Sequence, residues 1–357
     1  MTTGTPGGQR NNPAAISGLT DRPSMLRRRH RARTHRFSRP IFGFAVGVCL
    51  IFLAELGLRI ANTAPLYVPS ELAAWRLSPG LRRSQPGAMG GEQGTVGTND
   101  DGLRTTLGRA RRDEVKRVAV LGDSLVFGWG VDDGETLADG VAAGLGPGWE
   151  VLNAGVPGYS TVQAAWLFEE VVQHYLPDDV VLFLPLHDYS LVVVSDHETL
   201  AGGLGSKRTA EVWLARHSRI YAALSDLLVA PAPAAFQLEA ATSDGLTRVP
   251  RVDDTERTAA VTRLRVATAA LGARLWLGVL PTQSEIAFDV PPFFRHQKWL
   301  AEQRRTWPDV ATVDVRRCCR GRDLLLDHDL GHYAPKGNQE VGAAIAESLR
   351  GVEPPRL

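Results

Sequence analysis

The sequence has only three cysteines among its 357 residues, and their placement excludes a disulfide framework. Cys49 falls in an apolar segment, and Cys318 and Cys319 are adjacent, so a bridge between them would be strained. No Cys and His residues have the spacing of a zinc site. We therefore expect no metal site, and nothing in the sequence indicates a cofactor.

The sequence also lacks a basic stripe outside its first 40 residues. Those residues hold nine Arg and one Asp, while the whole chain has a net charge of only +1. The first 40 residues therefore carry about +8 and the remainder about −7. Nucleic-acid binding needs clustered Lys and Arg to neutralise phosphates. No nucleic-acid partner is expected.

One long apolar run stands near the amino terminus. Residues 41–54 carry no charge, and residues 55–60 extend the run to about 20 residues, the length that a membrane-spanning helix needs. Glu55 and Arg59 are spaced i, i+4 and can pair near the interface. Seven Arg precede the run, so the positive-inside rule places the amino terminus in the cytoplasm and the rest of the chain outside it.

This pattern predicts a disordered basic cytoplasmic tail over residues 1–40 and a single transmembrane anchor over residues 41–62, with the remainder on the extracytoplasmic side of the cell membrane. Two alternatives stay open. A cleaved signal peptide needs a small-x-small site, for which Ala61-Asn62-Thr63-Ala64 is a poor match. A buried helix of a soluble protein leaves the Arg cluster unexplained.

The rest of the chain alternates short apolar strands with helical patterns. The predicted strands are 118–121, 149–153, 179–186, 274–280 and 311–315. The predicted helices are 136–145, 161–175, 255–271, 293–306 and 337–350. Such alternation is typical of a parallel sheet with helices on both faces. The predicted fold class is therefore α/β, three layers with a five-stranded parallel sheet.

Two segments do not follow this alternation. Residues 63–108 hold Pro, Gly and charge with little pattern, and are interpreted as a connector with peripheral structure. Residues 187–250 form an irregular insertion within the main domain of residues 109–352, with some helix at 210–229. No Gly-x-Gly-x-x-Gly follows the first strand, which argues against a dinucleotide-binding fold.

Polar residues follow the first strand and precede the last helix. Gly122-Asp123-Ser124-Leu125 comes where ligands of open parallel sheets bind, although Asp and Ser there can also simply cap a helix. Asp329 and His332 stand three residues apart before the last helix. This spacing lets the carboxylate hold one imidazole nitrogen while the other faces a serine, which needs such a base to act as a nucleophile.

Together, Gly-Asp-Ser-Leu at 122–125 and Asp-x-x-His at 329–332 resemble the motifs of the GDSL (SGNH) hydrolases, especially their membrane-anchored bacterial branch. The resemblance covers roughly residues 95–350 and includes Asn153-Ala154-Gly155 after the second strand. It implies a flavodoxin-like fold, with Ser124 as nucleophile, His332 as general base and Asp329 orienting the imidazole. The backbone N–H groups of Ser124 and Gly155 would donate to the oxyanion, and Asp123 would order the turn.

One block departs from this family. Its third motif is Gly-x-Asn-Asp, with the Asn side chain as an oxyanion donor, whereas this chain has Pro185-Leu186-His187-Asp188. A neutral histidine can donate one N–H, so His187 can replace the Asn in the oxyanion hole. The alternative is that His187 points elsewhere and that the hole has two donors.

Three functions are compatible with these residues. The leading one is an extracytoplasmic serine esterase that hydrolyses O-acyl esters, a carbohydrate being one carrier of the acyl group. The second is an O-acyltransferase that passes the acyl group from Ser124 to a glycan hydroxyl. The third is a carbohydrate-binding module that has lost activity, which the substitution at His187 suggests.

Overall fold

The computed structural model describes residues 25–61, 64–70, 72–85, 94–201, 206–228, 247–282, 294–319, 323–327, 329 and 331–351. The chain forms two compact units, Met1–Ala54 and Glu55–Leu357, and each is considered by itself. Residues 1–24 of the predicted tail lie outside the described residues, as do 62–63 at the end of the predicted anchor.

Helix α1 runs from Met25 to Ile60 and contains Pro40. Its segment Pro40–Ile60, 21 residues long, is apolar enough to cross a membrane, and its large apolar side chains from Ile41 to Leu53 are exposed. Residues 25–40, which the sequence analysis placed in a disordered tail, are helical here. Arg is a good helix former, and neither Gly nor Pro interrupts residues 25–39.

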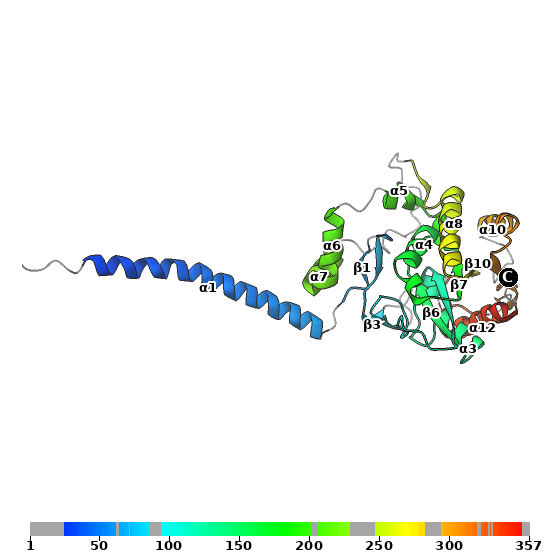
Figure 1. Cartoon of the computed structure of the whole chain (residues 1–357), viewed down its shortest axis with the longest axis horizontal. Coiled ribbons are helices and arrows are strands. Elements are labelled where there is room, and N and C mark those ends of the chain that lie inside the picture. The colour runs from blue at the N-terminus through cyan, green and yellow to red at the C-terminus, as the bar shows by residue number, and fades with distance from the viewer. Residues whose placement is uncertain are drawn as a thin grey trace, which may run out of the picture. The chain divides into compact units, whose positions relative to one another are not determined.

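Five strands form one parallel sheet in the order β11-β10-β7-β5-β6 (Figure 1). They are β5 (Lys116–Gly122), β6 (Trp149–Gly155), β7 (Asp179–Phe183), β10 (Arg274–Gly278) and β11 (Ala311–Val313). Counted along the chain, the strand order is 2-1-3-4-5, which is the flavodoxin-like order. The predicted fold class is confirmed, and β5 ends at the point where the order reverses.

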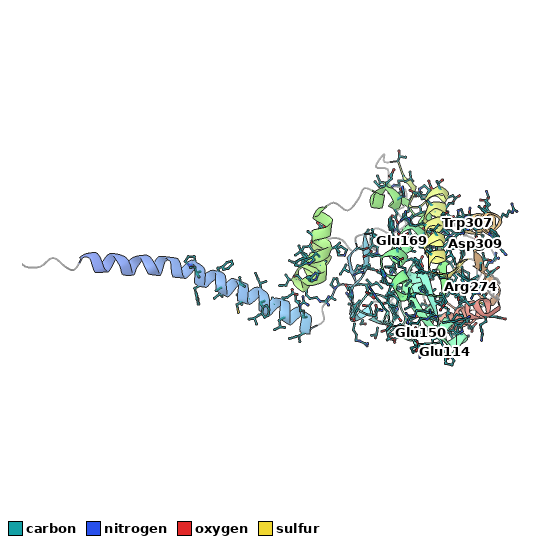
Figure 2. All side chains as sticks on the ribbon, viewed as in Figure 1. Glu114, Glu150, Glu169, Arg274, Trp307 and Asp309 are labelled. Carbon is teal, nitrogen blue, oxygen red and sulfur yellow. The ribbon has the colours of Figure 1, made fainter. Side chains whose placement is uncertain are left out.

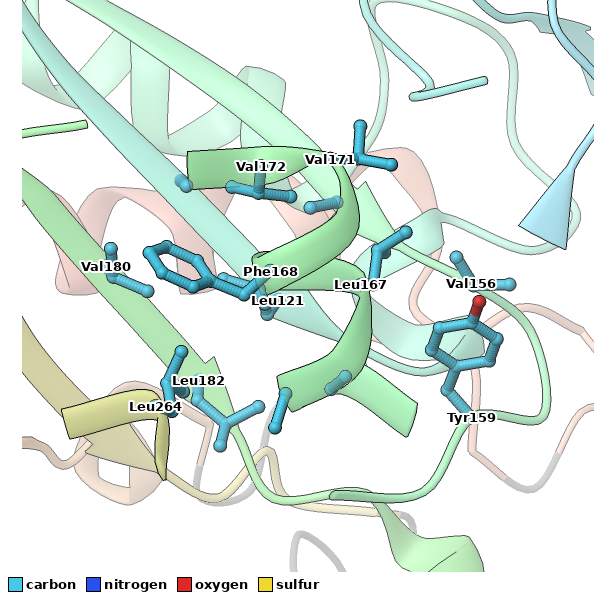
Figure 3. Packing of buried hydrophobic residues seen from close by; sticks show 14 of the residues in the cluster. Leu121, Val156, Tyr159, Leu167, Phe168, Val171, Val172, Val180, Leu182 and Leu264 are labelled. Carbon is cyan, nitrogen blue, oxygen red and sulfur yellow. The ribbon is translucent and has the colours of Figure 1, made fainter. Parts of the chain in front are cut away.

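Alternate residues of the central strand β5 pack on opposite faces of the sheet. Ala119 and Leu121 belong to the hydrophobic cluster that contains helices α4 (Thr161–Glu170) and α8 (Asp254–Ala270). Figure 3 shows Leu121, together with Val180 and Leu182 of the neighbouring strand, beside Phe168 of α4 and Leu264 of α8. Packing on this face therefore requires apolar side chains at one of the two alternating sets of positions in each strand.

The other face is covered by helices α3 (Leu137–Leu145) and α12 (Pro335–Gly351). Val118 and Val120 of β5 lie in this second cluster. Both faces of β5 are thus buried, which is why its sequence reads as a continuous apolar run rather than an alternating one.

Three helices begin with a capping box. Thr136, Ser160 and Asp253 each accept from the backbone N–H three residues later, and the side chain at that position bonds back. These caps mark the starts of α3, α4 and α8 in the sequence, and the predicted starts lie within one residue of the observed ones.

Shorter elements connect this frame. The remaining helices are α2 (Ser124–Phe127), η2 (Val172–Tyr175), η3 (Leu186–Tyr189), α5 (Asp196–Ala201), α6 (Ser206–His217), α7 (Arg219–Leu228), α10 (Phe294–Thr306) and α11 (Arg316–Cys319). The predicted helix 161–175 is therefore divided into α4 and η2, and the predicted strand 179–186 ends at Phe183. Strands β8 (Leu191–Val192) and β9 (Val249–Pro250) pair antiparallel and close the base of the insertion.

The segment before the sheet contributes to the main core. It contains two antiparallel pairs, β1 (Tyr67–Pro69) with β2 (Trp75–Leu77) and β3 (Arg82–Gln85) with β4 (Gly94–Gly97). Six of its residues are buried in the cluster that contains α4, namely Ala64, Ala73, Leu77, Leu81, Val96 and Leu103. This part of residues 63–108 is therefore integral to the domain and more than a connector.

Charged pairs tie the amino ends of the strands, opposite the predicted site. Arg117 is fully buried in β5 and donates to Glu150 of β6 at 2.9 and 2.6 Å. Arg274 of β10 donates to Asp179 of β7 at 2.8 Å. Glu150 and Arg274 are labelled in Figure 2.

Candidate active site

Ser124 begins helix α2 directly after the carboxyl end of β5. Asp123 is the N-cap residue, and its Oδ1 accepts from the N–H of Leu125 at 3.0 Å. Its carbonyl accepts from the N–H of Phe127 at 3.0 Å. Asp123 therefore orders the turn, as the sequence predicts, and fixes where the Ser124 side chain leaves the backbone.

Two glycines let α2 pack directly against the ends of its neighbouring strands. Gly122 and Gly155 are paired across β5 and β6. A Cβ on Gly122 would lie 2.5 Å from the Cγ2 of Val126, and a Cβ on Gly155 would lie 2.2 Å from the backbone N of Phe127. Neither position can hold a side chain without moving the helix that begins at Ser124.

The structure brings Ser124, His332 and Asp329 together. The Nε2 of His332 lies 2.8 Å from the Oγ of Ser124, although the two residues are 208 positions apart. The Nδ1 of His332 lies 2.8 Å from the Oδ2 of Asp329. The other carboxylate oxygen accepts from the N–H groups of Gly331 and His332, both at 2.8 Å. This is the geometry of an activated serine.

The loop that carries His332 is fixed from both sides. The carbonyl of His332 accepts from the N–H of Leu326 at 2.9 Å. The buried Tyr333 donates its hydroxyl to the carbonyl of Pro281 at 2.6 Å. Together these bonds hold the imidazole of His332 in a fixed position.

Asp329 is buried, and its charge is compensated locally. Burial raises the pKa of Asp329. The hydrogen bond and the charge of His332 lower it, as do the bonds from two backbone N–H groups, and together they outweigh burial, so the pKa lies below its ordinary value. The carboxylate therefore stays ionised while it accepts from the Nδ1–H of His332.

Arg104 clamps the loop that follows the nucleophile. Its buried guanidinium donates to the carbonyls of Phe127, Gly128 and Val131 at 3.0, 2.6 and 2.7 Å. It also donates to Asp133 at 3.0 Å. The sequence analysis missed this role, because the contacts are to backbone carbonyls that no sequence pattern identifies.

The N–H of Gly155, which we expected to donate to an oxyanion, is already used. It donates to the Oδ1 of Asn153 at 3.0 Å, while the Nδ2 of Asn153 donates to the carbonyl of Phe127 at 3.3 Å. In this structure the N–H of Gly155 is therefore engaged at the end of β6.

Two other backbone N–H groups near the strand ends remain open. The described residues offer no acceptor to the N–H of Ser124 or to that of Gly158. Gly158 lies in a turn closed by the bond from Tyr159 N–H to the Val156 carbonyl, with φ of 78° that favours glycine. The buried Arg251 fixes this turn by donating to the Gly158 carbonyl at 2.7 Å.

His187 lies in η3, just beyond the end of β7. Burial lowers its pKa below the ordinary histidine value, opposed by Asp123 and Asp188 and assisted by Arg251 and His332. These interactions place His187 in the electrostatic environment of Asp123 and His332. The ring is therefore neutral at pH 7 and carries one N–H donor.

Asp188, the neighbour of His187, has a structural role. It is fully buried and accepts from the N–H and Oγ1 of Thr161 at 2.8 and 2.6 Å and from Arg257 at 2.9 Å. Burial raises its pKa, but His296 and Arg257 outweigh this effect and lower it to about 2. The sequence analysis did not single out Arg257 or His296.

Among the described ranges, no group of three His, Cys, Asp or Glu side chains could hold a metal ion. His328 and Leu330, which flank Asp329, lie outside these ranges.

Solved structures resemble this chain in structure, whereas comparison of its sequence with family models and curated proteins finds no match. A GDSL-like lipase from Bacteroides thetaiotaomicron is 14% identical, with 69% of this chain and 92% of that chain covered at a TM-score of 0.39. A lipase/acylhydrolase from Enterococcus faecalis is 17% identical, with coverages of 66% and 96% and a TM-score of 0.40. An acetyl xylan esterase is 14% identical, with coverages of 65% and 99% and a TM-score of 0.38.

Proposed function

We propose that this protein is a serine esterase that hydrolyses O-acyl esters through an acyl-enzyme on Ser124. The observation that carries the proposal is the unbroken hydrogen-bond chain from Ser124 through His332 to Asp329, with 2.8 Å at both contacts. The imidazole is 24% exposed at its side chain, so a substrate can reach it.

The proposed reaction has two halves. The Oγ of Ser124 attacks the ester carbonyl while its proton passes to the Nε2 of His332, and the departing alkoxide then takes that proton and leaves as an alcohol. Water next attacks the acyl-enzyme with the same nitrogen as base, which releases the acid and restores Ser124. Throughout, the ionised Asp329 holds the Nδ1–H and stabilises the imidazolium.

The negative charge on the tetrahedral oxygen needs donors that point to it. We assign this role to the backbone N–H groups of Ser124 and Gly155, with His187 as a side-chain donor. The N–H of Gly155 would exchange its bond to Asn153 for the oxyanion. The N–H of Gly158, to which the described residues offer no acceptor, is a further backbone candidate. Each such donor is typically worth about 10²–10³ in turnover.

We further propose that α1 anchors the protein in the cell membrane, with the catalytic domain on the extracytoplasmic side. The apolar segment Pro40–Ile60 has the required length. The seven Arg between residues 27 and 39 favour a cytoplasmic amino terminus.

The test is covalent labelling and acid release by the full chain in detergent. One fluorophosphonate adduct, located on Ser124 by mass spectrometry, and acid release from a short-chain aryl ester are expected. A folded chain that gains no adduct and releases no acid contradicts the proposal and favours a binding module. Turnover that rises on addition of an oligosaccharide identifies a sugar hydroxyl, rather than water, as the preferred acceptor.

Replacing His187 with alanine is expected to lower kcat by about 10²-fold with little change in KM, because the donor acts on the transition state. His187→Asn keeps an N–H donor and is expected to retain most of the activity. His174→Ala, on an exposed histidine, is the control. Unchanged kcat in His187→Ala would mean that the oxyanion has only backbone donors.

A further inference from the structure

The hairpin of helices α6 and α7 is bonded to the last turns of α1. The carboxylate of Glu55 accepts from the N–H groups of Arg219 and Ile220 at 2.8 and 3.0 Å and from the hydroxyl of Ser218 at 3.1 Å. It therefore caps the amino end of α7. Arg59 donates to the carbonyl of His217, the last residue of α6, at 2.6 Å.

One ion pair thus satisfies both helix ends at the α6–α7 junction. Glu55 and Arg59 also bond each other at 2.7 Å. A cation at the carboxyl end of one helix and an anion at the amino end of the next both suit the helix dipoles. The junction is therefore held by four hydrogen bonds: Ser218 and α7 donate three to Glu55, and Arg59 donates one to the last carbonyl of α6.

The position of Glu55 in the sequence indicates where this junction lies relative to the membrane surface. Residues 41–54 are uncharged, and Glu55 is the first charged residue after them. In a helix that crosses a membrane, such a residue lies where the hydrocarbon ends. The hairpin that Glu55 caps must then start at the membrane surface on the same side as the catalytic domain.

The hairpin has one face on the protein and another face that no described residue covers. Val212, Ala215 and Ala222 are buried, and α6 packs against β1 (Figure 1). In contrast, Trp213, Leu214 and Leu224 are 59%, 37% and 49% exposed. Among the described residues, the ring of Trp213 stacks on His217 of its own helix, with centroids 4.6 Å apart.

Chemistry favours lipid as the occupant of this exposed face. Trp is enriched at the membrane interface, where an apolar ring with one polar N–H is at its most stable. Short amphipathic helices with Trp and Leu on one face lie in that plane. By sequence, α6 and α7 carry four Lys or Arg and two Asp or Glu, which favours anionic headgroups.

We propose that the α6–α7 hairpin is a membrane-interface element, which inserts Trp213, Leu214 and Leu224 among the lipid headgroups. The proposal rests on the proposed anchoring by α1. The hairpin is connected to the main domain through a series of contacts. Helix α6 packs on β1, and β1 pairs with β2. The carbonyl of Trp75 in β2 then accepts from the hydroxyl of Tyr159, just before α4. The hairpin thereby fixes the catalytic domain's orientation to the membrane.

The experiment measures quenching of Trp213 fluorescence by lipid. The full chain is reconstituted in vesicles of phosphatidylcholine and phosphatidylglycerol, with or without bromine near the headgroup end of the acyl chains. Wild type is compared with Trp213→Phe, so that the difference spectrum reports Trp213 alone. Trp149→Phe is the matched control, because Trp149 lies in β6 beneath Lys116 and away from the hairpin.

The Trp213 component is expected to be quenched by brominated lipid and protected from aqueous acrylamide, while the Trp149 component is not quenched by lipid. Glu55→Gln with Arg59→Gln, which frees the hairpin, is expected to reduce lipid quenching of Trp213 by about half or more and to leave hydrolysis of a soluble ester unchanged.

Two results overturn the proposal in different ways. A chain that floats with the vesicles but whose Trp213 is quenched by acrylamide and not by lipid keeps its anchor and has no interface element. A chain that does not float with the vesicles lacks the anchor itself, and the interface proposal falls with it.

Discussion

Replacing Ser124 with alanine is expected to lower kcat for ester hydrolysis by about 10⁴-fold or more, because the acyl-enzyme can no longer form. His332→Ala is expected to lose a similar factor. The double variant should be no slower than either single one, because residues joined by one hydrogen-bond chain act as a unit. Steady-state kinetics of the full chain with an aryl ester measure all three.

The control is Ser348→Ala, which removes a hydroxyl from α12 that bonds only within its own helix at 3.1 Å. Its kcat is expected to equal that of the wild type. Losses that add in the double variant would show that Ser124 and His332 act in separate steps. Retention of kcat in Ser124→Ala would remove the proposed nucleophile.

Replacing Arg257 with leucine is expected to lower the free energy of unfolding by about 3–5 kcal/mol, because it leaves a buried carboxylate without its cation. Arg257 and Asp188 are both fully buried and bonded at 2.9 Å. The pKa of Asp188, lowered to about 2, means that this carboxylate is ionised at neutral pH. Urea unfolding of the catalytic unit in the full chain measures the change.

The matched control lies on the same helix. Arg265→Leu breaks an exposed pair with Asp309 at 2.6 Å and is expected to cost less than about 1 kcal/mol. Equal effects of the two variants would contradict the assignment of the Asp188 and Arg257 pair as a structural anchor. Asp188 also accepts from Thr161 at the start of α4, and it is the sequence neighbour of His187. Arg257→Leu is therefore also expected to make the position of His187 less well defined.

The sheet could be predicted because its strands are buried on both faces and bounded by charge and turn residues. Val118 and Val120 must be apolar for one layer and Ala119 and Leu121 for the other. Such a run is easily recognised in the sequence. The pairing of Ser124 with Asp329 and His332 followed from parallel topology, since strand ends and the loops after them meet at one edge.

The rest of the site depends on contacts that leave no local pattern. Arg104, Arg251 and Arg257 bond to backbone carbonyls or to acids far away in the sequence. Gly155 is the last residue of β6, and only the structure shows that its N–H is already bonded to Asn153. Residues 25–40 are helical because Arg favours the helix and because the segment continues into the apolar run. The high charge of the segment suggested disorder instead.

The bond between Ser124 and His332 also has a consequence for the order of events during synthesis. Ribosomes extend chains at about 5–20 residues per second, so the 208 residues between nucleophile and base take roughly 10–40 s to make. During that interval the growing chain carries a serine without its proton acceptor. If the proposed function holds, esterase activity begins only when the last loop and α12 close on the sheet, and a product truncated before Asp329 is expected to be inactive.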